Sequence, residues 1–227
     1  MNVPNRAYYF EELYPLQDQA LRLITGLGTG FHLTGGTAAS RGYLQHRFSD
    51  DLDLFVNDDS RFGLWAERVV QIWTRAESWR VAILLRQERF FRLELTAPTA
   101  VLKIELINDV PARVGAPWLH PILGWLDTAE NILANKVSAL LDRQEPKDLA
   151  DIWGFCCRRG LSLEAAITGA QGKAAGIFPA DLARLLCSAT RTDWQVIRWI
   201  EAPLPDQFVG ELQRLGERLI LGEEKCA

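Results

Sequence analysis

The sequence contains little cysteine: four of its 227 residues, two of which are adjacent at Cys156 and Cys157. Neighbouring cysteines make a poor framework for disulfides, so a disulfide-stabilised secreted fold is not expected. The chain also begins without the basic segment and following apolar segment of a secretion signal. Together these absences predict a cytoplasmic protein with reduced thiols.

An excess of positive charge is also lacking. Lys and Arg total 25 against 29 for Asp and Glu, and the net charge of −4 provides no overall basic field for nucleic acid. Any site for a polyanion must therefore be local. The longest uncharged stretch, residues 23–40, contains five glycines and His32, which argues against a membrane span.

Repeats and low-complexity segments are absent, and the content of 48% apolar and 24% charged residues is that of a globular protein. The first part of the chain mixes strand and helix patterns, whereas most of the sequence after the Pro-rich stretch 111–121 has helical periodicity. We therefore predict an α+β domain over residues 1–124 and a helical domain over residues 125–227.

Apolar patterns and turn residues predict the individual elements. Strands are expected at 31–34, 51–56, 80–96 and 100–107, the last two as an antiparallel pair joined by a turn at Pro98. Helices are expected at 16–27, after Gly36, and from an N-cap at Ser60 to about residue 76. The second half is expected to form helices at 128–143, 147–158, 163–169, 180–186, 194–200 and 206–219.

Asp51 and Asp53 alternate with Leu52 and Leu54 on the expected strand 51–56. Since side chains alternate along a strand, the two carboxylates share a face and can bind divalent metal ions together. Mg²⁺ takes one or two carboxylates and leaves its other positions to water and substrate phosphates, so a nucleotide is the natural substrate. A solvated strand face or a turn is the alternative interpretation.

Two further features favour a nucleotide site. Gly35-Gly36-Thr37 lies between a strand and a helix, where glycine lets the backbone approach a triphosphate and the first helical N–H groups attract anions. An ordinary helix entry is the alternative. Glu105, on strand 100–107, would complete a triad of metal-binding carboxylates, or else it pairs with Lys103 on the surface.

Lys136 lies between Ile132 and Leu140 on the apolar side of the expected helix 128–143. It either points at a ligand or extends along the apolar surface to reach water. We expect Lys136→Met to preserve or raise stability, because a charge then leaves an apolar surface. Asp148 follows at the start of the next helix, where capping is its alternative role.

Taken together, these motifs resemble the AbiEii/AbiGii-type nucleotidyltransferase toxin family of the polymerase-β-like superfamily, over about residues 30–153. The resemblance is carried by Gly35-Gly36-Thr37, the segment 43–55, Lys103-Ile104-Glu105, the segment 130–136 and Lys147-Asp148-Leu149-x-Asp151. It implies a minimal mixed sheet with a helical C-terminal domain, two Mg²⁺ ions and a nucleoside triphosphate donor. In tRNA-modifying relatives it also implies transfer to the tRNA acceptor end, and a toxin of this kind implies an antitoxin partner.

The resemblance also implies roles for individual residues. The catalytic set is Asp51, Asp53, Glu105, Lys136 and Asp148, of which Asp51, Asp53 and Glu105 would hold the metal ions. The nucleotide-binding set is Gly35, Gly36, Thr37, Arg47, Ser49 and Lys136. Glu105 stands where the family frequently has Asp, and Arg47 and Ser49 alternatively support the strand.

Three functions fit this sequence: nucleotidyl transfer to RNA, transfer to a small molecule such as an aminoglycoside, or binding by a catalytically silent relative. Five arginines lie between residues 75 and 92, at positions 75, 80, 86, 89 and 92. Arg86, Arg89 and Arg92 are the best candidates for contacts with RNA phosphates. The alternative is that they form the solvated face of a strand pair.

Overall fold

The computed structural model describes residues 5–221. Residues 1–4, part of the segment expected to lack a secretion signal, lie outside the described residues. Among the helices of the described part, none combines the length and the apolar character that crossing a bilayer requires.

Seven strands form one mixed sheet in the order β3-β4-β5-β2-β1-β7-β6. Their bounds are β1 (His32–Thr34), β2 (Leu52–Asn57), β3 (Arg80–Gln87), β4 (Phe90–Thr96), β5 (Val101–Asp109), β6 (Trp118–His120) and β7 (Gly124–Leu126). Parallel pairing joins β2 to β5 and β1 to β7, and the other neighbours are antiparallel.

Helices precede, interrupt and follow the sheet. They are α1 (Tyr14–Thr25), α2 (Gly35–Thr37), α3 (Phe62–Thr74), α4 (Ala129–Arg143), α5 (Pro146–Trp153), α6 (Leu163–Gln171), α7 (Pro179–Cys187), α8 (Arg191–Val196) and α9 (Pro205–Leu221). Three π-helical segments, Tyr8–Leu13, Ala38–Leu44 and Gly154–Arg158, continue or precede them. The expected α+β class, with a mixed sheet and a helical C-terminal part, is confirmed.

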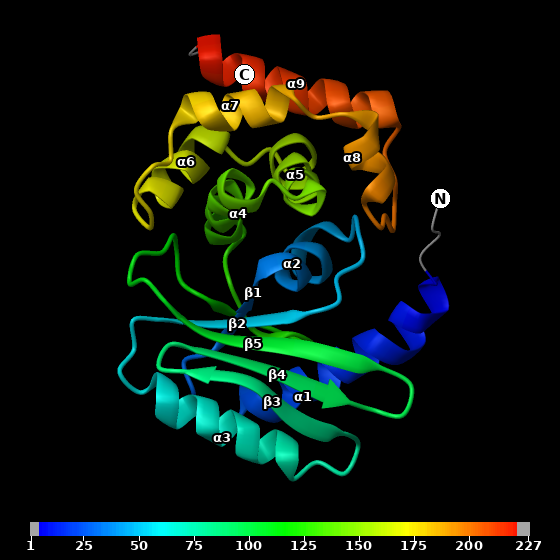
Figure 1. Ribbon diagram of the computed structural model, residues 1–227, viewed down its shortest axis with the longest axis vertical. Coiled ribbons are helices and arrows are strands. Elements are labelled where there is room, and N and C mark those ends of the chain that lie inside the picture. The colour runs from blue at the N-terminus through cyan, green and yellow to red at the C-terminus, as the bar shows by residue number, and fades with distance from the viewer. Residues whose placement is uncertain (1–4, 222–227) are drawn as a thin grey trace.

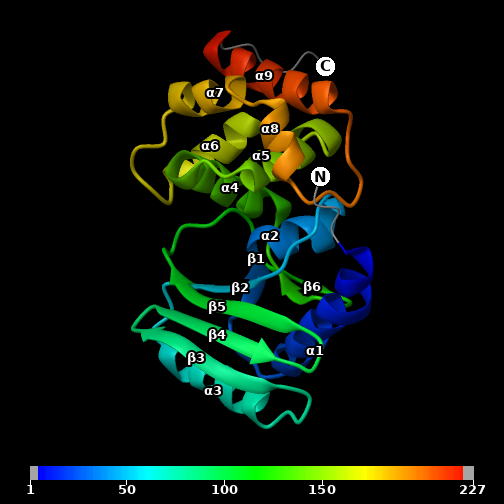
Figure 2. The same ribbon diagram turned by 45° about the vertical axis from the view of Figure 1, so that its right-hand side comes forward.

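The sheet separates two groups of helices. Helices α1 and α3 cover one face, and α2 with the stack α4 to α9 lies on the other side (Figures 1 and 2). Leu52 and Leu54 are buried within the core, whereas Asp51 and Asp53 project from the opposite side of β2, as the alternation predicts. The same alternation on β5 buries Ile104 and turns its polar neighbours the other way.

The prediction of one strand over residues 80–96 is wrong, because this segment forms two strands, β3 and β4, that pair as a hairpin. Their connection, Glu88-Arg89, contains no Gly or Pro, so the sequence gives no turn signal. The short strands β6 and β7 in and after the Pro-rich stretch were not expected. Because β7 begins at Gly124, the predicted division at residue 124 cuts a strand of the sheet, and the two-domain division stays a prediction.

Two other details differ from expectation. Ser60 does not cap α3; instead the Asp59 carboxylate accepts a hydrogen bond from the main-chain N–H of Arg61 at 2.8 Å. The expected helix 194–200 ends at Val196, because the chain then turns extended and pairs with residues 46–48. That pairing brings the C-terminal half against the end of the segment that leads into β2.

Candidate active site

A cavity of about 360 Å³ lies between the polar face of the sheet and the helical half. It is lined by Gly36, Arg47, Ser49, Asp50, Asp51, Asp53, Arg92, Lys103, Glu105, Lys136, Arg143, Glu145, Lys147 and Arg198. Seven of these side chains are cationic and five are carboxylates, so the lining has a formal excess of positive charge. The chain as a whole carries −4, so this cavity is a local anion site of the kind that the composition requires.

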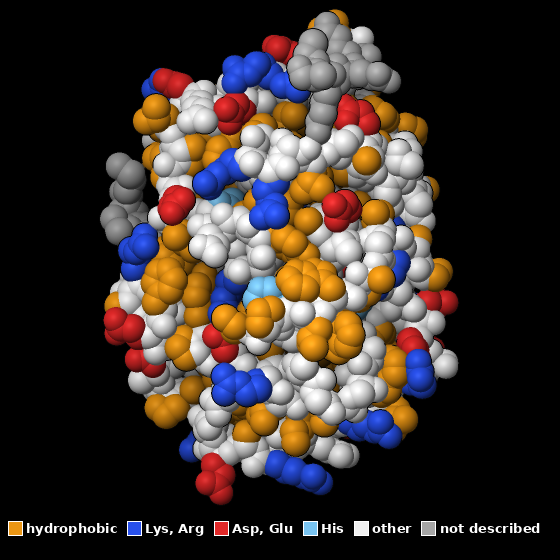
Figure 3. Space-filling view, turned by 180° about the vertical axis from the view of Figure 1, so that it is seen from behind, with side chains coloured by type: hydrophobic (Ala, Val, Ile, Leu, Met, Phe, Trp, Pro, Cys, Tyr) orange, Lys and Arg blue, Asp and Glu red, His pale blue; other side chains and the backbone are white. Residues whose placement is uncertain are grey.

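The face of the molecule seen from behind offers no comparable basic surface. Hydrophobic side chains gather across its middle, and Lys and Arg side chains are scattered singly among acidic ones (Figure 3).

Asp51 and Asp53 lie in this cavity without partners of their own. Within residues 5–221, neither carboxylate accepts a hydrogen bond or forms an ion pair. Burial, together with the negative charges of Glu105 and Asp51, raises the pKa of Asp53 to about 6, against the opposing effects of Lys136 and Lys103. Burial also raises the pKa of Asp51. Two crowded carboxylates that form no ion pair of their own are a favourable site for a cation.

Glu105 is placed beside Asp53 by the strand register, in which the two residues are direct partners of β2 and β5. Its carboxylate, however, accepts a hydrogen bond from Arg92 Nε at 3.0 Å and pairs with Lys103 Nζ at 2.9 Å. Glu105 therefore pairs with Lys103, as in the alternative interpretation, and the pair lies in the cavity; its membership of a metal-binding triad stays a prediction. Among the described side chains, no three of the types His, Cys, Asp and Glu are gathered closely enough to hold a metal ion.

The glycine turn fits closely against this site. Gly35 has a φ of +66°, and a Cβ atom there would lie 2.0 Å from Asp53 Oδ2. A Cβ at Gly36 would lie 2.9 Å from both Arg47 Nη2 and Ser49 Oγ. Any larger residue at 35 would displace the Asp53 carboxylate, so the turn is shaped by the site rather than by helix entry alone.

Thr37 is only 1% exposed and does not line the cavity. Its hydroxyl donates to the main-chain oxygen of Asp51 at 2.5 Å and lies 3.0 Å from the hydroxyl of Ser49. Thr37 therefore holds the backbone before β2, whereas Gly36 and Ser49 face the cavity. Its contact with a triphosphate stays a prediction.

Lys136 is neither solvated nor free. Its ammonium is buried and pairs with Asp148 Oδ1 at 2.9 Å and with Asp151 Oδ2 at 2.7 Å. Arg143 donates to both oxygens of Asp148, at 2.8 and 2.9 Å, and Arg47 donates to both oxygens of Asp151 at 2.7 Å. We call Arg47, Lys136, Arg143, Asp148 and Asp151 the buried ion cluster. Its three cations and two carboxylates leave one formal positive charge beside the cavity.

The carboxylates of this cluster are ionised. Burial alone would raise the pKa of Asp151, but Arg47 and Lys136 hold it well below its usual range. Lys136 and Arg143 lower the pKa of Asp148 in the same way, again against the effect of burial. Because the Asp148 side chain is engaged with these cations, it does not cap helix α5.

Arg198 is a cavity residue that the sequence did not indicate. It comes from the extended segment after α8, bonds to Asp50 and to the Tyr9 hydroxyl, and reaches the cavity from the far end of the chain. Its place depends on pairing between residues 46–48 and 197–200, in which Phe48 N–H donates to Arg198 O at 2.8 Å. No local motif marks such long-range pairing.

Arg86, Arg89 and Arg92 do not share a surface, contrary to the expectation of one basic patch. Arg92 lines the cavity, whereas Arg86 pairs with Glu67 of α3 on the other side of the sheet. Arg89 lies in the β3–β4 turn and pairs with Asp58. Arg86 pairs with Phe91 across the hairpin, and Phe91 and Arg92 are neighbours on β4, so Arg86 and Arg92 project from opposite faces of the sheet.

Comparison with known proteins agrees with these motifs. Residues 20–168 match the family model of the nucleotidyl transferase AbiEii toxin of type IV toxin–antitoxin systems. The chain belongs to the AbiEii family. It is therefore a nucleotidyltransferase toxin by family, and the resemblance in its motifs is confirmed.

Solved structures share the fold of this AbiEii-family protein. JHP933 from Helicobacter pylori superposes with a TM-score of 0.63 at 18% identity, covering 97% of this chain and 94% of that one. MenT4, a nucleotidyltransferase toxin from Mycobacterium tuberculosis, gives 0.64 at 16% identity, covering 98% and 87%. No curated protein sequence matches the chain.

Because of the buried ion cluster, we now predict that Lys136→Met lowers stability rather than preserving or raising it. Removing the ammonium leaves Asp148 and Asp151 with less compensation, and breaking a buried pair costs about 3–5 kcal/mol. We predict a loss of about that size in the free energy of unfolding, measured by urea denaturation. Lys147→Met, which removes a half-exposed pair with Glu145, should change it by less than about 1 kcal/mol. Equal stability of the two variants would contradict the cluster.

The raised pKa of Asp53 gives a second prediction. The folded-state pKa of about 6 exceeds the ordinary 3.8, so the ionised carboxylate lowers stability above pH 6, and this penalty disappears as pH falls toward 4. With EDTA present, Asp53→Asn should raise the free energy of unfolding by about 1–3 kcal/mol at pH 7.5 and by almost nothing at pH 4. Exposed Asp142→Asn should be neutral at both. A gain that is independent of pH would refute the assignment.

Proposed function

We propose that this toxin is a Mg²⁺-dependent enzyme that transfers a nucleoside monophosphate from a nucleoside triphosphate to RNA, at the acceptor end of tRNA. The observation that carries the proposal is the pair Asp51 and Asp53, unpaired among the described residues in a cavity otherwise rich in cations. An antitoxin partner and a cytoplasmic location, as in the sequence-based expectation, belong to the same proposal.

The residues present fit a divalent cation. Asp51 and Asp53 would hold it, and Glu105, the direct partner of Asp53 across the strands, is the nearest third carboxylate in register. Burial and the negative charges of Glu105 and Asp51 raise the pKa of Asp53, and a bound cation would favour its ionised form. When bound, Mg²⁺ neutralises phosphate charge and lowers the pKa of the attacking hydroxyl.

The chain's own cations would hold the triphosphate. Lys103, Arg143 and Lys147 come from three different elements and all face the cavity. Gly36 and Ser49 form the wall beside Asp53, where the absence of a Cβ at position 36 lets the Arg47 and Ser49 side chains pack against the turn. Positioning and charge neutralisation are the main contributions a protein makes to nucleotidyl transfer, because the chemistry itself needs little else.

Lys136 contributes through the buried ion cluster. Its ammonium lines the cavity while it pairs with Asp148 and Asp151, so the two aspartates fix its position. Asp148 is therefore a positioning residue in this proposal, since it is fully buried and does not line the cavity. Arg47 is held in the same way by Asp151.

RNA is the preferred acceptor because the cation-rich lining continues beyond the carboxylates. Arg92 on β4 and Arg198 after α8 lie at different sides of the same cavity and remain half-exposed. Local cations of this kind give a protein of net charge −4 a surface for a phosphate backbone.

The direct test incubates the purified protein with each α-labelled nucleoside triphosphate, Mg²⁺ and total RNA, and then separates the products. We expect label in RNA of tRNA size, no label when EDTA is present, and at least a hundredfold loss for Asp51→Asn. Asp142→Asn, an exposed change elsewhere, should retain full transfer. Label on a small molecule would favour the aminoglycoside-type alternative, and no transfer at all would favour a silent binding relative.

The glycine turn supplies a separate prediction for the same assay. Gly35→Ala should lower transfer at least tenfold, because the new Cβ would displace the Asp53 carboxylate and strain a positive φ. Gly63→Ala in helix α3 is the matched control, since nothing lies within 4 Å of its added Cβ. Gly63→Ala should leave transfer unchanged and cost no stability. Full activity of Gly35→Ala would show that Asp53 has room to move.

A further inference from the structure

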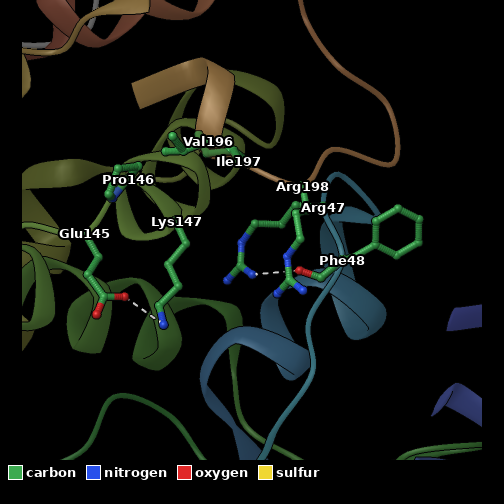
Figure 4. A pocket seen from close by; sticks show the side chains of 8 residues that line it. All are labelled: Arg47, Phe48, Glu145, Pro146, Lys147, Val196, Ile197 and Arg198. Carbon is green, nitrogen blue, oxygen red and sulfur yellow. Dashed lines mark hydrogen bonds and ion pairs between the residues drawn. The ribbon is translucent and has the colours of Figure 1, made fainter. Parts of the chain in front are cut away.

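A second cavity adjoins the catalytic one and has no role in the mechanism above. Its volume is about 290 Å³, and Figure 4 shows its eight lining side chains. The two cavities share Arg47, Glu145, Lys147 and Arg198. A molecule bound at the carboxylates could therefore extend into this side pocket without leaving the protein surface.

The side pocket has an apolar end and a charged end. Pro146, Val196 and Ile197 lie together at one end, and the charged groups of Lys147 and Arg198 extend away from them (Figure 4). The residues at the charged end are the ones shared with the catalytic cavity. The pocket therefore changes from cationic to apolar with distance from the catalytic carboxylates.

Val196 is 62% exposed although it is hydrophobic and lies at the end of helix α8. Ile197, next to it, is buried, so the two residues form an apolar wall of which one part is uncovered. A flat apolar group of a ligand would cover this surface and gain free energy by removing it from water.

The backbone around the side pocket is fixed. Phe48 N–H donates to Arg198 O at 2.8 Å, and Ile200 N–H donates to His46 O at 2.8 Å. These bonds join the wall that follows α8 to the segment that leads into β2. The pocket is thus preformed, and a ligand need not supply the cost of ordering its wall.

We propose that this side pocket receives a nucleobase, with the attached sugar and phosphate at the charged end. The proposal rests on the proposed nucleotidyl transfer and assigns it a base-binding subsite. A nucleobase is flat, with apolar faces and a polar, phosphate-bearing side, which matches the two ends of the pocket. The base belongs either to the donor triphosphate or to the terminal nucleotide of the RNA acceptor, and the two sources are separable by experiment.

The test fills the apolar end with Val196→Trp. Because Val196 is largely exposed, the larger side chain does not have to enter the core. Leu204→Trp, at a residue that is 74% exposed and lines neither cavity, is the matched control. Thermal unfolding of both variants verifies that they are folded. The ligands are the four nucleoside triphosphates and ribose 5-triphosphate, which lacks a base, each measured by calorimetry without RNA.

If the donor base occupies the pocket, Val196→Trp weakens binding of at least one nucleoside triphosphate tenfold or more and leaves ribose 5-triphosphate within twofold. If the acceptor base occupies it, triphosphate binding is unchanged and the Kd for RNA, measured without a triphosphate, rises at least tenfold. Equal weakening of all triphosphates, ribose 5-triphosphate included, or no change in either measurement, overturns the proposal. The binding measurements do not require nucleotidyl transfer, so they test the base-binding subsite even if the proposed activity is not detected.

Discussion

The position of the helical half against the sheet depends on the buried ion cluster. Asp151 of α5 accepts two hydrogen bonds from the Arg47 guanidinium and pairs with Lys136 of α4. His46 adds a third contact, with Nε2 3.0 Å from Asp151, and burial lowers its pKa so that the ring stays neutral. Buried charges are costly unless each is compensated, so these segments have little freedom to move apart.

This cluster also explains how an acidic protein forms a cationic cavity. The sheet contributes polar side chains on one face because its apolar residues occupy the other. These include carboxylates together with Arg92 and Lys103, and the helices placed over that face add further lysine and arginine. The two aspartates that hold Lys136 and Arg143 do not themselves line the cavity. The helical half therefore presents positive charge to the site and keeps the balancing carboxylates behind it.

Features set by local periodicity could be predicted from the sequence. The alternation on β2 and β5 correctly put the carboxylates opposite the leucines, and the helical period correctly put Lys136 on an apolar helix face. Its partners could not be known, because they lie on the next helix and meet it only through packing. The β3–β4 turn lacks Gly and Pro, so the segment 80–96 was predicted as one strand, and the position of Arg86 on the face away from the cavity could not be predicted. Arg198 required a pairing across about 150 residues, for which no local pattern exists.

Three residues with unusual backbone, ionisation or exposure lie at the two adjoining cavities. Gly35 has a positive φ against the Asp53 carboxylate, Asp53 is held with a raised pKa, and Val196 leaves apolar surface uncovered. The last two are unfavourable for the unliganded chain, and a bound metal ion or base would relieve them. A sequence selected for stability alone would have removed such costs, which requires only a single substitution at each position. Their concentration around one site is therefore best explained by ligand binding, because functional sites are where local rules are expected to fail.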